Sequence, residues 1–367
     1  MSERAPIVAI GDLAPSSELA ARVRALLARG ALCALPTETV YGLAARADRP
    51  EALESLRVLK GRPSELTFTW HVAERGAVAH FPELRPLTRR LTERYWPGPL
   101  TLVLRGVPAG LEGVARDGWT GLRLPAHAAC AGLLSACEFP VVMTSANPHR
   151  EAPLTRAEDV AARFDGALEL VVDGGPSRLG EASGVLALGA GRFELLREGL
   201  LRLEDLRRTA GLRIAFVCTG NTCRSPMAEA LARTLLGQRL QADRAGRAGL
   251  AEFGFELASM GILAAHGAPA SVGAVEVMAE RGIHLRDHRS RAALSEALSR
   301  SDRVYAMTAG HLDSLRALLP PGRHPPLELL DPAGADIADP LGGPRAAYQR
   351  SLADIERAVR ARLDEWA

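Results

Sequence analysis

The chain has 367 residues, of which 47% are hydrophobic and 24% charged, and its formal net charge is +2. This length predicts two domains, and the small net charge excludes a general attraction to nucleic acid or membrane. Five cysteines in so long a chain exclude a disulfide scaffold. The N-terminus has no signal-peptide pattern, and no stretch approaches roughly 18 uninterrupted apolar residues. We therefore expect a cytoplasmic protein without membrane contact.

The first half alternates strand-like apolar runs with helical patterns, which predicts an α/β fold. Residues 16–29 predict a helix that ends at Gly30, and Pro50 opens a helix that runs to Lys60. Strands are expected at or near 31–36, 66–72, 100–104, 121–125, 140–145 and 168–172.

The end of the first half contains a helix start and a change of composition. Thr155 and Glu158 have the spacing of a capping box for a helix. An arginine-rich polar segment, 197–211, then leads into a new strand-like start. We therefore place two domains at 1–208 and 212–367.

The second half continues the alternation of strands and helices, and no internal repeat connects it to the first half. Strands are expected at 212–217 and 303–307. Helices are expected at 225–236, 309–319 and 345–366. This order predicts a second α/β domain.

Lysine and asparagine are almost absent from the chain. Lys60 is the only lysine, and the only asparagines are Asn147 and Asn221. All three lie in turn segments rich in glycine, proline or hydroxyl residues. Chance is the alternative explanation. We interpret the three residues as parts of functional sites at which arginine, aspartate or serine cannot replace them.

The most specific pattern in the sequence is "CTGNTCRSP", residues 218–226. In a loop of this length, successive amides can converge on an anion at a helix N-terminus, and Arg224 adds a planar fork for two phosphate oxygens. The same charges predict a thiolate at Cys218, the form that attacks phosphorus. Gly220 can supply a tight or positive-φ turn, and Asn221 can hold the loop through its side chain. A buried structural cysteine would not require these residues in this order.

The segment resembles the active-site loop of low-molecular-weight protein phosphatases, and the resemblance extends over 212–367. It implies a doubly wound parallel sheet, a phosphorylated protein as substrate and no metal. In the implied reaction Cys218 takes the phosphoryl group while Asp339 protonates the leaving group, and Asp339 then activates water. Ser225 can donate to the sulfur and help it leave.

Two Asp-Pro pairs, at Asp331 and Asp339, could supply the acid. The resemblance favours Asp339 because Gly342, Gly343 and Tyr348 follow it as in bacterial members, and Asp331 is then a turn residue. We expect Cys218, Arg224 and Asp339 to be catalytic. The residues expected to support the loop are Thr219, Gly220, Asn221, Thr222, Cys223 and Ser225.

The substrate of this half stays open between phosphoarginine and phosphotyrosine. Thr222 resembles the loop of bacterial protein arginine phosphatases, in which a branched hydroxyl residue replaces the isoleucine of tyrosine-directed relatives. Leu341 stands where tyrosine phosphatases, and most arginine-directed relatives, have an aromatic residue. We favour phosphoarginine, and an arsenate reductase of similar fold is a distant third reading. Cys223 either forms a reversible disulfide that shelters the nucleophile or is a small loop-packing residue.

Polar residues in the first half stand at predicted strand and helix ends. They are Thr37 in "LPTETVYGL", Lys60 in "LKGRP", Arg123 in "GLRLP", and Ser145 and Asn147 in "TSAN". If these side chains converge, they would bind a polyanionic ligand, and a lysine supplies a compact charge where a guanidinium does not fit. The alternative is a set of ordinary turn residues and exposed charges.

Five motifs resemble, in this order, those of L-threonylcarbamoyladenylate synthases: "LPTETVYGL", "KGRP", "RYWPGPLTLVL", "GLRLP" and "TSAN". The resemblance covers about residues 7–205 and implies a YrdC-like twisted α/β sheet. It also implies synthesis of threonylcarbamoyl-AMP from L-threonine, bicarbonate and ATP, with Mg²⁺ and release of pyrophosphate. The product serves the N6-threonylcarbamoyl modification of adenosine 37 in tRNA, so tRNA or proteins of tRNA modification are the implied partners.

By motif position, Lys60 and Arg62 would hold phosphates, and Thr37 and Arg123 the threonylcarbamoyl group. The other residues implied for the nucleotide site are Ser145, Asn147, Ser183 and Arg197. No covalent enzyme intermediate is implied, because these groups orient the reactants and neutralise charge. We assign no metal ligands, since the histidines have no ligand spacing.

The sequence departs from the synthase pattern in four segments. Thr67 replaces a proline, His149 and Arg150 replace Ser-Gly, "SGVLA" at 183–187 loses a hydroxyl and an acid, and Glu198 replaces a proline. The alternative is therefore a degenerate nucleotide- or double-stranded-RNA-binding module attached to an active tyrosine phosphatase. We expect synthesis to survive, because the core basic, Ser and Asn residues are intact.

Overall fold

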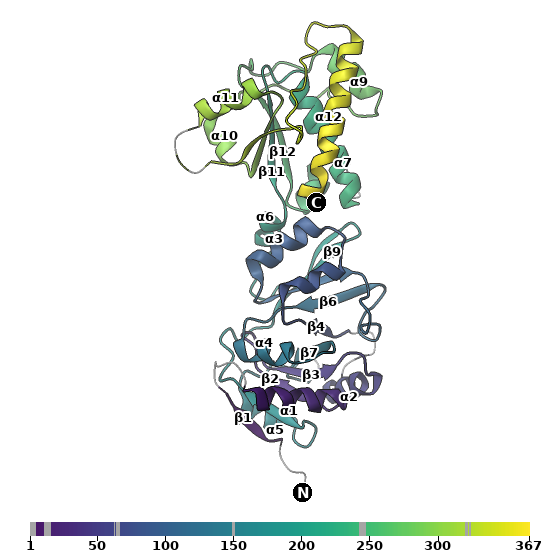
Figure 1. The fold of residues 1–367 in the computed structure, drawn as a ribbon, viewed down its shortest axis with the longest axis vertical. Coiled ribbons are helices and arrows are strands. Elements are labelled where there is room, and N and C mark those ends of the chain that lie inside the picture. Colours follow the sequence, from purple (N-terminus) through teal and green to yellow (C-terminus); the bar gives the residue numbers. More distant parts are fainter. Residues whose placement is uncertain are drawn as a thin grey trace. The chain divides into compact units, whose positions relative to one another are not determined.

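The computed structural model describes residues 5–10, 16–61, 63, 67–148, 151–241, 247–319, 322 and 324–367. The chain divides into two compact units, Met1–Asp205 and Leu206–Ala367, and the division falls within helix α6 (Leu203–Ala210). Each unit has a sheet of its own with helices packed on it, which confirms the predicted α/β fold class (Figure 1).

The first unit contains a ten-stranded mixed sheet in the order β1-β8-β2-β3-β7-β4-β6-β5-β9-β10. Its strands are β1 (Ile7–Ala9), β2 (Cys33–Leu35), β3 (Gly42–Arg46), β4 (Thr69–His71), β5 (Leu100–Arg105), β6 (Trp119–Arg123), β7 (Val141–Ser145), β8 (Leu170–Asp173), β9 (Gly184–Gly189) and β10 (Arg192–Arg197). Its helices are α1 (Ser17–Ala28), α2 (Pro50–Lys60), η1 (Arg75–His80), α3 (Arg85–Tyr95), α4 (Ala128–Ser135) and α5 (Ala157–Arg163).

Both faces of β2, β3, β7 and β8 are buried, because side chains alternate between two cores. Cys33 and Leu35 of β2 pack with residues of α1 and α4 on one face. Ala34 of the same strand packs with residues of α2 and α5 on the other face. Strands buried on both faces read as continuous apolar runs, which is why β2, β7 and β8 were predicted from the sequence, whereas β3 was not predicted.

The second unit contains a four-stranded parallel sheet in the order β12-β11-β13-β14. Its strands are β11 (Arg213–Cys218), β12 (Glu256–Gly261), β13 (Arg303–Ala306) and β14 (Leu327–Leu329). Its helices are α7 (Arg224–Leu240), α8 (Arg247–Glu252), α9 (Val272–Ala279), α10 (Ser295–Ser299), α11 (Ala309–Leu318) and α12 (Arg345–Trp366). Helices α7, α9 and α12 lie on one side of the sheet and α10 and α11 on the other, as a doubly wound fold requires (Figure 1).

The four strands are parallel, but their order changes side at β11: β12 lies on one side of β11, and β13 followed by β14 lies on the other. Ligands of open α/β sheets bind at the carboxyl end of the strands at such a point. Cys218 is the last residue of β11 and stands at that end. The fold therefore places the predicted nucleophile at the expected ligand position.

Several element boundaries agree with the sequence predictions, and one local prediction is wrong. Helices α2 and α12 have the predicted bounds. The capping box does not form, because the N-cap of α5 is Arg156 and makes no side-chain cap bond. The sequence analysis also missed the β9–β10 hairpin, whose second strand is largely exposed and so lacks an apolar run.

The described residues include no helix with both the length and the hydropathy needed to cross a membrane. Nor do His, Cys, Asp and Glu side chains gather in these ranges into a group of three or more that could hold a metal ion.

Candidate active sites

The phosphate loop of the second unit joins the end of β11 to the start of α7. Within the described part of the chain, the backbone amides of residues 220–223 donate to no acceptor. The loop turns at Asn221, which has a left-handed φ of 55°. Of the two turns that Gly220 could supply, tight or positive-φ, the positive φ belongs instead to Asn221. Amides in such a turn form a concave anion site, so the loop can bind a phosphate group.

The Cys218 sulfur lies at the base of this loop, buried and next to a hydroxyl. Its Sγ is 3.0 Å from Ser225 Oγ, at the start of α7. Asn221 Nδ2 donates to the same Ser225 oxygen at 2.9 Å, which leaves the Ser225 proton to the sulfur or to the carbonyl of Met260. Ser225 can therefore donate to a thiolate, as predicted from its position after Arg224.

Arg224 is buried and is held from two sides. Its Nη1 donates to the carbonyl of Ile337 at 3.1 Å, and its Nη2 forms an ion pair with Asp339. Its Nε is buried and has no hydrogen-bond partner in the protein. An unpaired buried N–H is unfavourable, and an oxygen of a phosphate in the loop would satisfy it.

The two aspartates of the Asp-Pro pairs have different environments. Asp339 has a side chain 43% exposed, contacts Arg224, and accepts the amide of Leu341 at 3.2 Å. Asp331 is buried, accepts the amide of Ala333 at 2.8 Å and pairs with Arg357 of α12. Asp339 is thus the carboxylate that reaches the phosphate loop, and Asp331 closes its own turn.

Cys223 lies on the side of the loop that faces α9 and α12. Its thiol donates to Ser271 Oγ at 3.1 Å and lies 3.9 Å from Tyr348 Oη. Burial raises the pKa of Tyr348, so the phenol stays protonated. Both loop cysteines are free thiols, and the protective disulfide stays a prediction.

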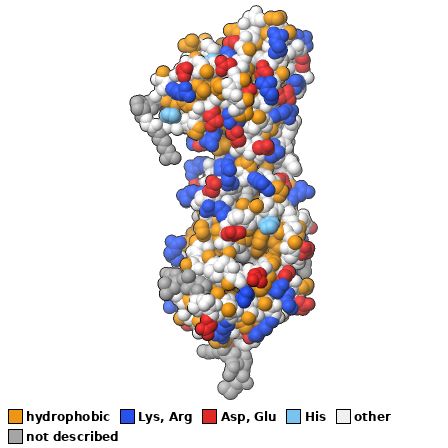
Figure 2. Space-filling view, viewed as in Figure 1, with side chains coloured by type: hydrophobic (Ala, Val, Ile, Leu, Met, Phe, Trp, Pro, Cys, Tyr) orange, Lys and Arg blue, Asp and Glu red, His pale blue; other side chains and the backbone are white. Residues whose placement is uncertain are grey.

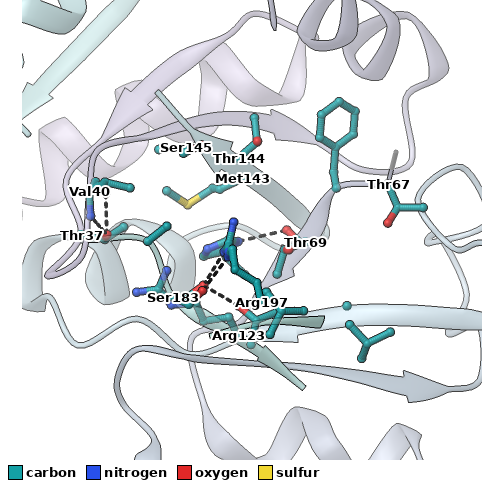
Figure 3. A pocket seen from close by; sticks show the side chains of 18 of the residues that line it. Thr37, Val40, Thr67, Thr69, Arg123, Met143, Thr144, Ser145, Ser183 and Arg197 are labelled. Atoms are coloured by element: carbon teal, nitrogen blue, oxygen red, sulfur yellow. Dashed lines mark hydrogen bonds between the residues drawn. The ribbon is translucent and has the colours of Figure 1, made fainter. Parts of the chain in front are cut away.

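The first unit has a cavity of about 280 Å³ on its sheet (Figure 3). Alternate residues of several strands point into it: Thr69 and His71 of β4, Thr101 and Val103 of β5, and Gly121 and Arg123 of β6. Further hydroxyl groups in its lining come from Thr37, Thr67, Thr144, Ser145 and Ser183. No carboxylate is among the described residues that line it. The cavity therefore offers hydrogen-bond donors and positive charge to an anion.

Arg123 is fixed in the wall of this cavity by a buried ion pair. Its Nη2 donates to Glu38 Oε1 at 2.7 Å and to Thr39 Oγ1 at 2.8 Å. Glu38 Oε2 accepts the amide of Ala126 at 2.9 Å. Burial lowers the pKa of the neighbouring His71 to about 3, with a smaller contribution from the charge of Arg123, so this ring is neutral.

A second guanidinium reaches the cavity from β10. Arg197 Nε donates to the carbonyl of Ser183 at 2.8 Å, and its Nη2 donates to Ser183 Oγ at 3.1 Å (Figure 3). Ser183 Oγ in turn lies 2.9 Å from Thr101 Oγ1. Burial and the positive charge of Arg123 lower the pKa of Arg197, as expected where two cations share a site.

Lys60, Ser145 and Asn147 form a buried cluster that borders the cavity. Lys60 Nζ donates to the Ser145 carbonyl at 2.6 Å and to Asn147 Oδ1 at 3.1 Å. Only Ser145 of this cluster also lines the cavity. Arg62, predicted beside them, lies outside the described residues, as do His149 and Arg150.

Thr37 lines the cavity and is held by its own loop, with Oγ1 donating to the Val40 carbonyl at 2.6 Å. The sequence analysis missed the contributions of Thr69, His71, Thr101 and Thr144. The two-residue spacing of Thr69 and His71 on a predicted strand was an available signal, since it places both on one face. Thr101 and Thr144 have no polar residue two positions away and carried no such signal.

Mg²⁺ prefers several oxygen ligands, usually including carboxylates or phosphates. The described lining of the cavity supplies only hydroxyl oxygens and cationic groups. These residues fit Mg²⁺ only as an ion bound through the phosphates of a nucleotide.

Comparisons with known proteins agree with this division into two sites. The family model described as "Telomere recombination" (Sua5/YciO/YrdC) matches residues 25–199, and that of "Low molecular weight phosphotyrosine protein phosphatase" matches residues 213–366. A threonylcarbamoyl-AMP synthase of Pyrococcus abyssi is 37% identical over 196 residues, which are 50% of this chain and 54% of the relative. This chain thus spans about half the length of that relative.

The second unit has a relative of nearly its own length. The protein-arginine-phosphatase of Geobacillus stearothermophilus is 38% identical over 150 residues, 40% of this chain and 90% of the relative. The structure of P. abyssi Sua5 complexed with L-threonine has a TM-score of 0.51 at 21% identity and covers 96% of this chain and 98% of that one, which shows a likeness of fold. The chain belongs to both families, the first through residues 25–199 and the second through residues 213–366.

Proposed function

We propose that this chain is a bifunctional enzyme. The first unit forms threonylcarbamoyl-AMP from L-threonine, bicarbonate and ATP for modification of tRNA adenosine 37. The second unit hydrolyses phosphoarginine in proteins. The synthase proposal rests on the similarity to relatives named threonylcarbamoyl-AMP synthase, one of which is described in complex with L-threonine.

The observation that carries the synthase proposal is the presence of both Arg123 and Arg197 in a cavity whose described lining is rich in hydroxyl groups and includes no carboxylate. The reactants carry many negative charges, on the triphosphate of ATP and on the carboxylate and carbamate groups of the carboxylated threonine. Nearby cations are needed to neutralise these charges during the reaction. The Lys60 ammonium is hydrogen-bonded to Ser145, which lines the cavity. From this position its charge can stabilise a phosphate. The enzyme itself would orient the reactants and neutralise charge, without a covalent intermediate.

The test of this proposal is threonine-dependent release of pyrophosphate from ATP in bicarbonate buffer. We expect release by the intact chain and its loss in Lys60→Ala. The rival function, a nucleotide- or double-stranded-RNA-binding module, predicts no pyrophosphate release and no effect of Lys60→Ala on any activity.

For the phosphatase, the carrying observation is the buried, unpartnered Nε of Arg224 beside four free loop amides. These donors would bind the phosphate while Cys218 Sγ attacks phosphorus and the bond to the leaving group breaks. Asp339, on the exposed side of Arg224, would give its proton to the leaving nitrogen or oxygen. It would then take a proton from the water that hydrolyses the thiophosphate, and Ser225 would donate to the departing sulfur.

The choice of phosphoarginine rests on Thr222 of the loop. The rim of the loop argues against phosphotyrosine, but most arginine-directed relatives also have an aromatic residue at the position of Leu341. Leu341 is 65% exposed and its amide donates to Asp339, while Leu263 is 78% exposed and its amide donates to the carbonyl of Thr219. Both are aliphatic, so neither offers a ring on which a phenyl phosphate can stack. The relative named protein-arginine-phosphatase adds to this support.

Substrate choice is tested with two peptides of one sequence that carry phosphoarginine or phosphotyrosine. We expect a higher kcat/KM for phosphoarginine, and a Leu341→Tyr variant should raise kcat/KM for phosphotyrosine more than for phosphoarginine. Leu294→Tyr is a matched control, because Leu294 is 63% exposed and its amide donates to Ala292 instead. A large preference of the unmodified chain for phosphotyrosine would reject the proposed substrate.

A further inference from the structure

His311 connects the phosphate loop of the second unit to the first turn of α11. Its Nε2 lies 2.9 Å from Thr219 Oγ1, and its Nδ1 lies 2.8 Å from Thr308 Oγ1. Thr308 is also the N-cap of α11, since its hydroxyl accepts the amide of His311. The side chain is 5% exposed and both of its ring nitrogens are engaged, so the orientation of the ring is fixed.

Thr219 extends this connection to the catalytic arginine. It directly follows Cys218, and its hydroxyl accepts a long hydrogen bond, 3.5 Å, from Arg224 Nη2. Its backbone has little freedom, because its carbonyl accepts the amide of Leu263, and a Cβ at Gly261 would lie 2.5 Å from the same carbonyl oxygen. With the backbone held in this way, His311 determines where the Thr219 hydroxyl points.

The junction between β13 and α11 also supports Arg224 from a second direction. The carbonyl of Met307 accepts the amide of Ile337 at 2.8 Å, and the carbonyl of Ile337 accepts Arg224 Nη1 at 3.1 Å. Residues 307–311 therefore contact both the phosphate loop and the segment that carries Asp339. The two hydrogen bonds of His311 are part of this support.

The electrostatic environment keeps the ring neutral. Burial lowers the pKa of His311, the positive charge of Arg224 lowers it further, and Asp339 and Asp336 oppose the shift. A neutral ring places no second cation beside the guanidinium. Because neutral imidazole carries one proton, one of the two threonine hydroxyls donates to the ring and the other accepts from it.

We propose that His311 is a positioning residue of the phosphatase site. Through the hydroxyl of Thr219 it holds the Arg224 guanidinium where its Nε–H faces the phosphate of the substrate. His311 transfers no proton and does not touch the substrate. The inference rests on the proposed phosphatase function of the second unit.

Two variants of the full-length chain separate the two bonds of the ring. The amide of His311→Gln reaches about as far as Nε2 and can keep the bond to Thr219, whereas that of His311→Asn reaches only as far as Nδ1 and keeps the bond to Thr308. With p-nitrophenyl phosphate as substrate, we expect His311→Asn to lower kcat/KM about tenfold and to raise the inhibition constant of inorganic phosphate about tenfold, the effect of one lost hydrogen bond. His311→Gln should stay within about twofold of the unmodified chain for both quantities.

Thermal unfolding of the same samples distinguishes positioning from stability. If both variants keep the kinetics and phosphate inhibition of the unmodified chain and only their melting temperature falls, His311 is structural and the proposal is wrong. It is equally wrong if His311→Gln loses as much as His311→Asn, because the bond to Thr219 is then not the one that matters. An unmodified chain that neither hydrolyses p-nitrophenyl phosphate nor responds to phosphate would instead overturn the phosphatase function.

Discussion

The two candidate sites of this chain are built in different ways. In the second unit, one continuous segment from Cys218 to Ser225 contains the proposed nucleophile, the amides and the arginine, and of the proposed catalytic residues only Asp339 comes from a distant part of the sequence. In the first unit, the cavity takes side chains from several strands that are far apart in the sequence, and Arg123 is bound to a glutamate 85 positions away. A continuous loop shows its chemistry in the sequence, whereas a cavity on a sheet depends on the strand order.

The largest effect is expected for Arg224→Lys, which tests whether the continuous loop suffices. Lysine cannot reproduce a planar fork with three nitrogens, two of which are occupied by Ile337 and Asp339. We expect kcat/KM for a phosphopeptide to fall on the order of 10³-fold. Arg213→Lys, at the exposed start of β11, is the matched control and should change nothing. Near-normal activity in Arg224→Lys would show that the loop does not bind phosphate as described.

Asp339→Asn tests the one distant contribution to this site. An amide cannot protonate the leaving group, so kcat should fall roughly 10²-fold while the inhibition constant of inorganic phosphate changes little. Asp331→Asn provides the contrast, because Asp331 pairs with Arg357 and not with the loop. That variant should lose stability more than activity. Equal losses of kcat in both variants would contradict the assignment of the acid.

Parts of the second site could be predicted from the sequence, and other parts could not. The order of Cys218, Arg224 and Ser225 follows from the local pattern, because amides at a helix N-terminus need no distant partner. Asp339 lies 115 positions from Arg224 in the sequence, and its role as the acid was expected only from the family resemblance; its contact with Arg224 was not predicted. Gly220 was expected to permit a tight or positive-φ turn, and the positive φ lies at Asn221. The side chain of Asn221 bonds to Ser225 and to the amide of Arg291, in line with the expectation that it holds the loop. Asparagine tolerates the left-handed region, so either residue was compatible with the pattern.

For the first unit, Arg197→Gln tests whether the cavity needs its second cation. Glutamine can keep a bond to Ser183 but removes the charge, and bonds to charged groups contribute about 1.5–3 kcal/mol. Threonine-dependent pyrophosphate release should therefore fall about 10- to 100-fold. The control is Arg192→Gln. Arg192 is on the same strand, but its guanidinium lies over the Trp119 ring and does not line the cavity. If both variants keep full activity, the cavity is not the nucleotide site.

The first site was less predictable for a physical reason. Lys60, Ser145 and Asn147 were expected together, and they do form one hydrogen-bonded cluster. The threonines of β4 and β5 were missed, because a hydroxyl in a strand is as common in a core as in a site. Only the pairing of β4 with β6 and of β5 with β9 places Thr69, Arg123 and Ser183 around one cavity.

The smallest effect concerns the neutral His71 in that cavity. Its pKa is lowered to about 3 in the folded chain, from an ordinary value of 6.5. At a pH between these two pKa values, His71 binds a proton in the unfolded chain but not in the folded chain. Stability should therefore rise with pH across this range, and lowering the pH from 7 to 5.5 should cost about 1 kcal/mol through His71. Urea unfolding followed by tryptophan fluorescence reports mainly on the first unit, since Trp366 is the only tryptophan of the second. In His71→Gln the pH dependence should shrink by that amount, and an unchanged dependence would contradict a buried neutral ring.

A crossed assay on intact protein tests the central claim of two separate sites in one chain. Each of three proteins (unmodified, Cys218→Ser and Arg197→Gln) is assayed for threonine-dependent pyrophosphate release and for phosphate release from a phosphoarginine peptide. We predict that Cys218→Ser loses only phosphate release, that Arg197→Gln loses only pyrophosphate release, and that the unmodified chain performs both reactions. Absence of threonine-dependent pyrophosphate from the unmodified chain, or phosphate release that survives in Cys218→Ser, would contradict it.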